Sequence, residues 1–97
     1  MIADKIKELR IKRDYSQSTL AKKLNVTRST VNAWESGINV PSVQCLTELC
    51  SLFQTTADYL LGLSNKLTLS LDNLTDEEIK VLYDLIDIFV KNKNIEN

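Results

Sequence analysis

A run of short polar side chains, interrupted by a single arginine, lies between residues 16 and 36. No acidic residue occurs between Asp14 and Glu35, whereas a solvated helix face usually carries several Glu/Lys pairs. Arginine can bond two acceptors of guanine, asparagine can read adenine, and serine or threonine can reach base edges or phosphates. These residue types predict a surface that contacts double-stranded DNA. The candidate contact residues are Gln17, Ser18, Thr27, Arg28, Ser29, Thr30, Asn32, Ala33 and Ser36.

Basic charge is concentrated in the first third of the chain. The net charge of all 97 residues is −1, but residues 1–30 carry eight basic and three acidic side chains. Residues 66–97 carry four lysines and seven acids. A phosphate backbone responds to the local patch and not to the sum over the chain. The distribution is therefore compatible with a nucleic-acid partner, although surface helices are commonly charged and the pattern is weak by itself.

Two helices joined by a tight turn must hold this polar surface, in a motif over about residues 16–36. Ser16 and Thr27 are good N-caps for the two helices, and Asn25-Val26 makes the turn between them. Gly37 ends the second helix because glycine readily takes the left-handed conformation. A fixed crossing angle needs small and apolar residues where the helices meet. The residues that supply this contact are Leu20, Ala21, Leu24, Val26, Val31 and Trp34.

Further helices flank the motif. Apolar spacing predicts a first helix over residues 2–13, a fourth helix that opens at Pro41-Ser42, and a short fifth helix between Thr56 and Gly62. No convincing sheet pattern occurs. The sequence therefore predicts an all-α fold with a five-helix domain over residues 1–62.

The helical spacing of apolar residues ends after Gly62, and residues 63–74 are expected to form a linker. Leu67, Leu69 and Leu71 alternate with polar residues, which is the spacing of a strand. The pattern leaves two interpretations open: a short extended segment, or a linker packed loosely on the domain.

A last helix is expected over residues 75–97, regular to about Lys91. Thr75 and Glu78 form a capping box at its start. Apolar residues cover more of its circumference than one packing surface needs. We expect it to meet both its own domain and the same helix of a second subunit, because a chain this small can hardly bury a helix completely. The candidate dimerisation residues are Ile79, Leu82, Ile86, Phe89 and Val90.

Taken in order and spacing, residues 5–62 resemble the lambda-repressor-like (Cro-type, XRE) family of helix-turn-helix regulators. The resemblance implies a compact five-helix fold that places the third helix in the major groove of DNA. It implies nothing about residues 63–97, since that part of the family varies widely. The residues that carry the likeness are Leu9-Arg10, Ser16-Gln17, Leu20-Ala21, Val26-Thr27, Val31, Trp34-Glu35, Gly37, Pro41-Ser42 and Asp58-Tyr59-Leu60-Leu61-Gly62.

The resemblance also implies individual roles on the motif. Gln17 matches the residue that opens the second helix, anchors to a phosphate and touches the reading helix. Arg28 and Ser29 match the main base-reading positions. Asn32 and Ala33 match secondary reading positions.

Other positions carry implied roles outside the reading surface. Ser36 and Asn39 match loop positions that meet phosphate or a nearby base. Arg10 and Glu35 resemble an ion pair that ties the first helix to the end of the third. Asn25 stands where the family usually has glycine, and asparagine tolerates a left-handed backbone better than most residues.

The remaining chemistry-bearing residues indicate no catalytic, metal or cofactor site, so no enzyme is expected. The chain has no histidine, which removes the commonest general base and leaves Cys45 and Cys50 short of a zinc site. We interpret both cysteines as core residues, with a thiol redox switch as the alternative. The only glycines, Gly37 and Gly62, form no phosphate-binding loop. The acids Asp76–Glu78 are explained by the capping box.

The sequence therefore predicts a DNA-binding transcriptional regulator, a homodimeric repressor of an inverted-repeat operator. Its charged start lacks the apolar core of a signal peptide and no membrane segment is expected. We expect it in the bacterial cytoplasm, on the nucleoid when bound to DNA. The alternative is a protein-interaction module, an antitoxin or adaptor that binds a protein partner through residues 66–97.

Overall fold

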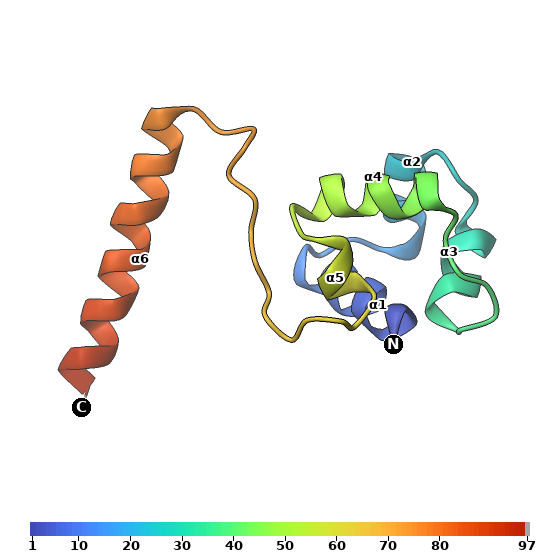
Figure 1. Cartoon of the computed structure of the whole chain (residues 1–97), viewed down its shortest axis with the longest axis horizontal. Helices are drawn as coiled ribbons and strands as arrows, with labels where there is room; N and C mark the ends of the chain where they lie inside the picture. Colours follow the sequence, from blue (N-terminus) through green and yellow to red (C-terminus); the bar gives the residue numbers. More distant parts are fainter. Residues whose placement is uncertain (97) are drawn as a thin grey trace.

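The computed structural model describes residues 1–96, with the side chains of residues 1–93, and contains six α-helices and no strand in that range (Figure 1). No helix among these residues is both long and apolar enough to cross a membrane. The predicted all-α class is confirmed. The helices are α1 (Ile2–Lys12), α2 (Gln17–Leu24), α3 (Arg28–Glu35), α4 (Val43–Phe53), α5 (Ala57–Leu60) and α6 (Asp76–Glu96).

Serine and threonine start four of these helices. Ser16, Thr27, Ser42 and Thr56 each accept a hydrogen bond on the side-chain oxygen from the backbone amide three residues later, at 3.0–3.1 Å. Such an N-cap satisfies one of the amides that the first helical turn leaves without a partner. The starts of α2–α5 are therefore set by local chemistry that can be read from the sequence.

Left-handed residues end the first five helices. Around Gly37, with φ +76°, the amide of Ile38 donates to the carbonyl of Ala33 at 3.0 Å and the amide of Gly37 donates to that of Trp34 at 3.3 Å. This pair of bonds is a Schellman motif, which gives partners to the last helical carbonyls. The left-handed residues that end α1–α5 are Asp14, Asn25, Gly37, Gln54 and Gly62.

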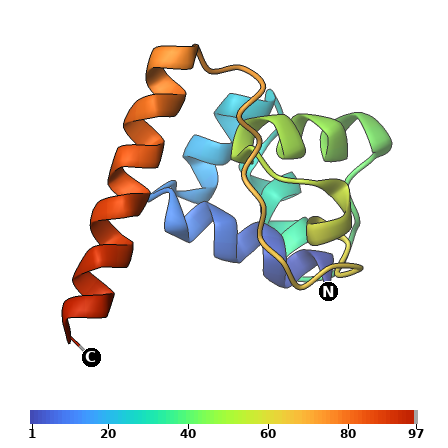
Figure 2. The same cartoon turned by 60° about the vertical axis from the view of Figure 1, so that its left-hand side comes forward.

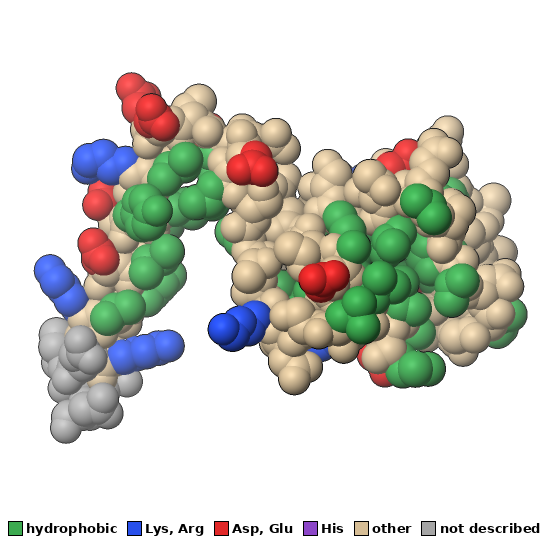
Figure 3. All heavy atoms as spheres, in the orientation of Figure 1, with side chains coloured by type: hydrophobic (Ala, Val, Ile, Leu, Met, Phe, Trp, Pro, Cys, Tyr) green, Lys and Arg blue, Asp and Glu red, His purple; other side chains and the backbone are tan. Residues whose placement is uncertain are grey.

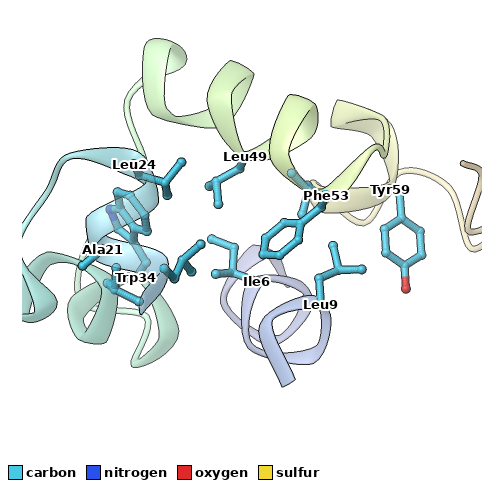
Figure 4. Close-up of a cluster of buried hydrophobic side chains, with 11 residues drawn as sticks. Ile6, Leu9, Ala21, Leu24, Trp34, Leu49, Phe53 and Tyr59 are labelled. Atoms are coloured by element: carbon cyan, nitrogen blue, oxygen red, sulfur yellow. The ribbon is translucent and has the colours of Figure 1, made fainter. Parts of the chain in front are cut away.

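One hydrophobic core holds α1–α5 together, and α3 lies against both α1 and α2. Trp34 and Val31 of α3 are 3% and 0% exposed, and they pack with Ala21 of α2. Figure 4 shows Ala21, Leu24 and Trp34 at one end of the core, and Phe53, Leu9 and Tyr59 at the other. With its apolar side buried, α3 must turn its opposite side to solvent. The buried core residues are Ile6, Leu9, Leu20, Ala21, Leu24, Val31, Trp34, Leu49, Phe53, Tyr59 and Leu60.

The linker runs along the side of this domain as irregular chain. Residues 63–74 contain no strand, so the alternating leucines lie in irregular chain and not in a sheet. A strand needs a neighbouring strand to satisfy its backbone, and the described residues offer none. The amide of Ser70 instead donates to the carbonyl of Gln54 at 3.0 Å, which attaches the linker to the end of α4.

The start of α6 is the capping box that the sequence predicts. The amide of Thr75 donates to Glu78 Oε1 at 2.9 Å, and the amide of Glu78 donates to Thr75 Oγ1 at 3.2 Å. The helix continues to Glu96, beyond the expected end near Lys91, because no glycine or proline follows Lys91 to stop it.

The packing of α6 differs from the expectation. Figure 1 shows α6 standing apart from α1–α5, joined to them by the linker, and Figure 2 shows the same helix from another side. Most of its apolar side chains are exposed, including Ile86 at 52% and Phe89 at 60%, and Ile79 and Leu82 are half-buried. The expectation that one side of this helix packs on its own domain is therefore wrong.

Candidate DNA-binding interface

The first two turns of α3 present a polar surface to solvent. Thr27 caps the helix, and its hydroxyl also lies 2.8 Å from the hydroxyl of Thr30. Arg28, Ser29 and Asn32 are exposed and together line a shallow depression. Asn32 lies three and four positions after the other two, so the three side chains share one side of the helix.

Gln17 connects the start of α2 to this surface. Its Nε2 donates to Asn32 Oδ1 at 3.3 Å and to Glu35 Oε1 at 3.2 Å. The amide is therefore fixed against α3, which orients Asn32 from one side. Gln17 and Ser18 open α2, where the unpaired amides of a first helical turn favour an anion such as phosphate.

Arg10 and Glu35 form a nearly buried ion pair behind the polar surface. Arg10 Nε and Nη2 donate to the two oxygens of Glu35 at 2.6 and 3.0 Å, and Arg10 Nη1 donates to the carbonyl of Tyr15 at 2.8 Å. The two side chains are 12% and 4% exposed. The pairing that the family resemblance implied is thus present, and it joins α1 to the last turn of α3.

The other candidate contact residues lie on α2, on α3 and in the segments that cap or follow α3. Ala33 and Thr30 are only half-exposed, because each lies next to the buried stripe of α3. Ala33 also accepts the loop amides of Ile38 and Asn39 at 3.0 and 3.3 Å. The exposed candidates are Ser18, Thr27, Arg28, Ser29, Asn32, Ser36 and Asn39, and the half-buried ones are Gln17, Thr30 and Ala33.

Three exposed apolar residues, two in the loop between α3 and α4 and one at the start of α4, were not predicted from the sequence as part of this surface. Ile38, Val40 and Val43 are 73%, 73% and 82% exposed. The sequence does contain an indication of them: three branched apolar residues surround Pro41, where a solvated loop would usually carry polar residues. They lie beside Asn39 and extend the edge of the candidate surface.

The two cysteines lie on α4 and away from this surface. Cys45 and Cys50 are free and half-buried, and both pack against the core. The described residues contain no group of side chains suited to a metal ion. Burial raises the pKa of the Cys50 thiol above its ordinary value, as is expected for a packing residue.

Comparison with known proteins gives this fold a family. The model of the helix-turn-helix family matches residues 6–60. This stretch begins within α1, contains α2–α5 in full and includes every residue of the buried core. This chain belongs to the helix-turn-helix family, in its lambda-repressor-like (XRE) branch. The family consists of DNA-binding regulators and not of enzymes.

Individual helix-turn-helix proteins are similar to this chain in sequence and in fold. The HTH-type transcriptional regulator AnsR of Bacillus subtilis is 42% identical over 62 residues, which are 64% of this chain and 53% of AnsR. This chain thus spans about half the length of that relative. The crystal structure of SinR, a master regulator for biofilm formation, in complex with DNA has a TM-score of 0.58 at 32% identity, over 63% of this chain and 98% of that one. The P22 c2 repressor bound to a synthetic operator has a TM-score of 0.59 at 27% identity, over 62% and 91% of the two chains.

Proposed function

We propose that this chain is a sequence-specific transcriptional repressor that binds an inverted-repeat DNA operator as a homodimer. The observation that carries the proposal is the exposure of Arg28, Ser29 and Asn32 on the outer side of α3, while Trp34 and Val31 bury the opposite side. A helix held in this way can enter a major groove with its first turns against base edges. The solved complexes of SinR with DNA and of the P22 c2 repressor with an operator support this use of the fold.

Arg28 and Ser29 would read bases, with Asn32 and Ala33 at secondary positions. Arg28 has the most specific proposed role, because a guanidinium can donate to two acceptors of one guanine. The hydrogen bond from Gln17 fixes Asn32 before DNA arrives. A residue already held in one rotamer loses less conformational entropy when it binds.

Phosphates would be held around this reading surface. The start of α2 supplies Gln17 and Ser18, and its last turn supplies Lys22 and Lys23, which are exposed. Ser36 and Asn39 lie at the far end of α3 and reach the next stretch of backbone. Because cations bound to DNA are released by each phosphate contact, affinity should fall steeply with added salt.

Two-fold symmetry sets the form of the operator. A dimer presents two α3 helices, so the half-sites should be inverted repeats whose centres are about 34 Å apart, or a multiple of that distance. A bacterial nucleoid is the setting that we propose for this complex.

Selection of bound DNA from random sequence tests specificity, symmetry and spacing together. We expect an inverted repeat with fixed spacing. Arg28→Ala should then weaken binding to the selected site by about 1–3 kcal/mol and blur one base position in each half-site. Lys66→Ala removes the same charge from the linker and serves as the control. If Arg28→Ala binds selected and scrambled DNA as the parent does, the base-reading assignment fails.

A second function is favoured by one observation, the exposed apolar side of α6. An antitoxin or adaptor would use this side to bind a different protein through residues 66–97. A chain ending at Gly62 separates the two functions, because the core cluster lies entirely before that residue. As a repressor, the shortened chain is a monomer that binds a half-site weakly. As an adaptor, it loses its protein partner, and its DNA affinity equals that of the full chain.

A further inference from the structure

We infer that α6 pairs with the α6 of a second copy in antiparallel orientation, with the two-fold axis close to Leu85 and Ile86. The inference rests on the homodimer proposed above and specifies its geometry. It follows from three features of the chain: the shape of the apolar surface, the charges at its two ends, and the distance between the two linkers that such a pair creates.

The apolar surface of α6 is wide and continues onto the linker. At about 3.6 residues per turn, its apolar residues cover roughly 220° of the circumference. Leu69 and Leu71 of the linker, together with Ile79, Leu82 and Ile86, line one apolar groove. Figure 3 shows hydrophobic side chains gathered on the side of α6 that faces the rest of the molecule. One helix laid in this groove would cover both α6 and the linker leucines, which explains why the apolar surface exceeds a single stripe.

The charges at the ends of this surface are opposite. Glu78 lies one turn before Leu82, and Lys93 lies one turn after Phe89, so that both sit in line with the apolar residues. The first turn of α6 carries Asp76, Glu77 and Glu78, and the last carries Lys93.

An antiparallel second copy matches this order residue by residue. With the axis between Leu85 and Ile86, Leu82 meets Phe89 of the partner subunit and Glu78 meets Lys93 of the partner subunit. The helix dipoles also oppose each other in this arrangement. A parallel pair would instead set Glu78 against its own copy and Lys93 against its own copy, which is unfavourable at both ends.

Antiparallel pairing also suits a dimer in which both helix-turn-helix domains are bound to DNA. The two copies of Asp76 would be roughly 28 Å apart along the helix axis, at 1.5 Å per residue. The linkers would therefore leave from opposite ends of the pair. That separation is near the roughly 34 Å between successive major-groove faces on one side of DNA. In a parallel pair both linkers would start only about 8–10 Å apart.

Disulfide cross-linking of the full chain tests the orientation. In a background with Cys45→Ser and Cys50→Ser, single cysteines are introduced as Ile86→Cys and, separately, Ile79→Cys. An antiparallel pair brings the two copies of position 86 together and keeps the copies of position 79 about 20 Å apart, too far for a disulfide. We expect covalent dimers from Ile86→Cys only. Covalent dimers from both variants, or from neither in a chain that sediments as a dimer, would overturn the inference.

A charge variant with the natural cysteines provides an independent test. Lys93→Glu places like charges at both ends of an antiparallel pair, and we expect the dissociation constant of the dimer to rise about ten-fold. Adding Glu78→Gln removes this repulsion and keeps the capping box, so it should restore part of the affinity. Lys91→Glu, on the charged side of α6, is the matched control. An unchanged dissociation constant for Lys93→Glu overturns the antiparallel arrangement, whereas a parent chain that is monomeric overturns the homodimer itself.

Discussion

Arg10 and Glu35, 25 positions apart in the chain, are joined by two hydrogen bonds of 2.6 and 3.0 Å. The guanidinium and carboxylate are planar groups, so two parallel bonds fix their orientation as well as their distance. Glu35 also accepts the Gln17 amide at 3.2 Å. One carboxylate therefore ties together α1, the start of α2 and the end of α3, the three elements that set the direction of the candidate reading helix.

Removing one partner of this pair should strongly destabilise the domain. Arg10→Ala leaves the 4%-exposed Glu35 carboxylate without its cation, and we expect the free energy of unfolding in urea to fall by about 3 kcal/mol. Arg10→Lys should recover only part of the loss, because an ammonium cannot make both bonds in one plane. Lys80→Ala, which removes the exposed pair of Lys80 and Asp84 at 3.5 Å, is the control and should change little. A loss for Arg10→Ala no larger than for Lys80→Ala would show that the pair does not hold the domain.

The side-chain cap of Thr27 should stabilise α3. Thr27→Ala removes the oxygen that accepts the Thr30 amide at 3.1 Å, and it should lower the free energy of unfolding by about 1 kcal/mol. Thr27→Ser keeps that oxygen and should retain most of the stability. Urea unfolding measures both variants. Equal losses for alanine and serine would mean that the methyl group, and not the cap, is what matters at this position.

Substitutions at the left-handed residues that end α3 and α4 should change the stability of the domain in opposite directions. Gly37→Ala should destabilise by about 1 kcal/mol, since an added Cβ meets nothing within 4 Å and the cost comes only from φ +76°. Gln54→Gly should stabilise, because Gln54 already has φ +54° and glycine takes that conformation without strain. The gain is partly offset by the greater freedom of glycine in the unfolded chain. The midpoints of thermal unfolding of the two variants and the parent check this prediction. A higher midpoint for Gly37→Ala would show that the positive φ at position 37 is not the cause of the cost.

Most of the domain could be predicted from local sequence because its helices carry their own start and stop signals. The caps at Ser16 and Thr27 and the stop at Gly37 are within one residue of their predicted places. The left-handed residues Asp14 and Gln54 were not foreseen, since neither type marks that conformation as clearly as glycine does.

The outer parts of the chain were harder to predict, for a physical reason. Whether α6 packs on its own domain depends on whether that domain leaves a matching apolar surface, which periodicity within α6 cannot reveal. The alternation of Leu67, Leu69 and Leu71 likewise shows that one side is apolar, but a strand also needs a partner. The roles of Arg28 and Ser29 came from their residue types and the family resemblance, and they stay predictions until DNA binding is measured.

The ionisation of the Cys50 thiol should show that this side of α4 is buried in the folded chain. Burial raises the pKa of its thiol, so in the Cys45→Ser variant Cys50 should stay protonated, and react slowly with a thiol reagent, at a pH where an unfolded thiol is already ionised. The same shift stabilises the fold below the unfolded pKa, and this contribution is lost as the pH rises through the folded pKa. Reaction rates measured against pH, with and without urea, check this. Identical profiles would show that Cys50 is as solvated in the folded chain as in the unfolded one.

A charge placed in the apolar surface of α6 should abolish assembly without unfolding the domain. Leu82→Asp puts a carboxylate among Ile79, Ile86 and Phe89, where a second subunit would have to desolvate it. We expect the parent to sediment as a dimer and the variant as a monomer. The fluorescence of Trp34, the only tryptophan and 3% exposed, reports the core of α1–α5 separately, and its unfolding transition should be the same in both, because Leu82 lies outside that core. Asp84→Ala, on the charged side of α6, should leave assembly unchanged. If Leu82→Asp sediments like the parent, α6 does not form the subunit interface. A shift of the Trp34 transition in the variant would show that α6 stabilises the domain, contrary to the separation of the two in Figure 1.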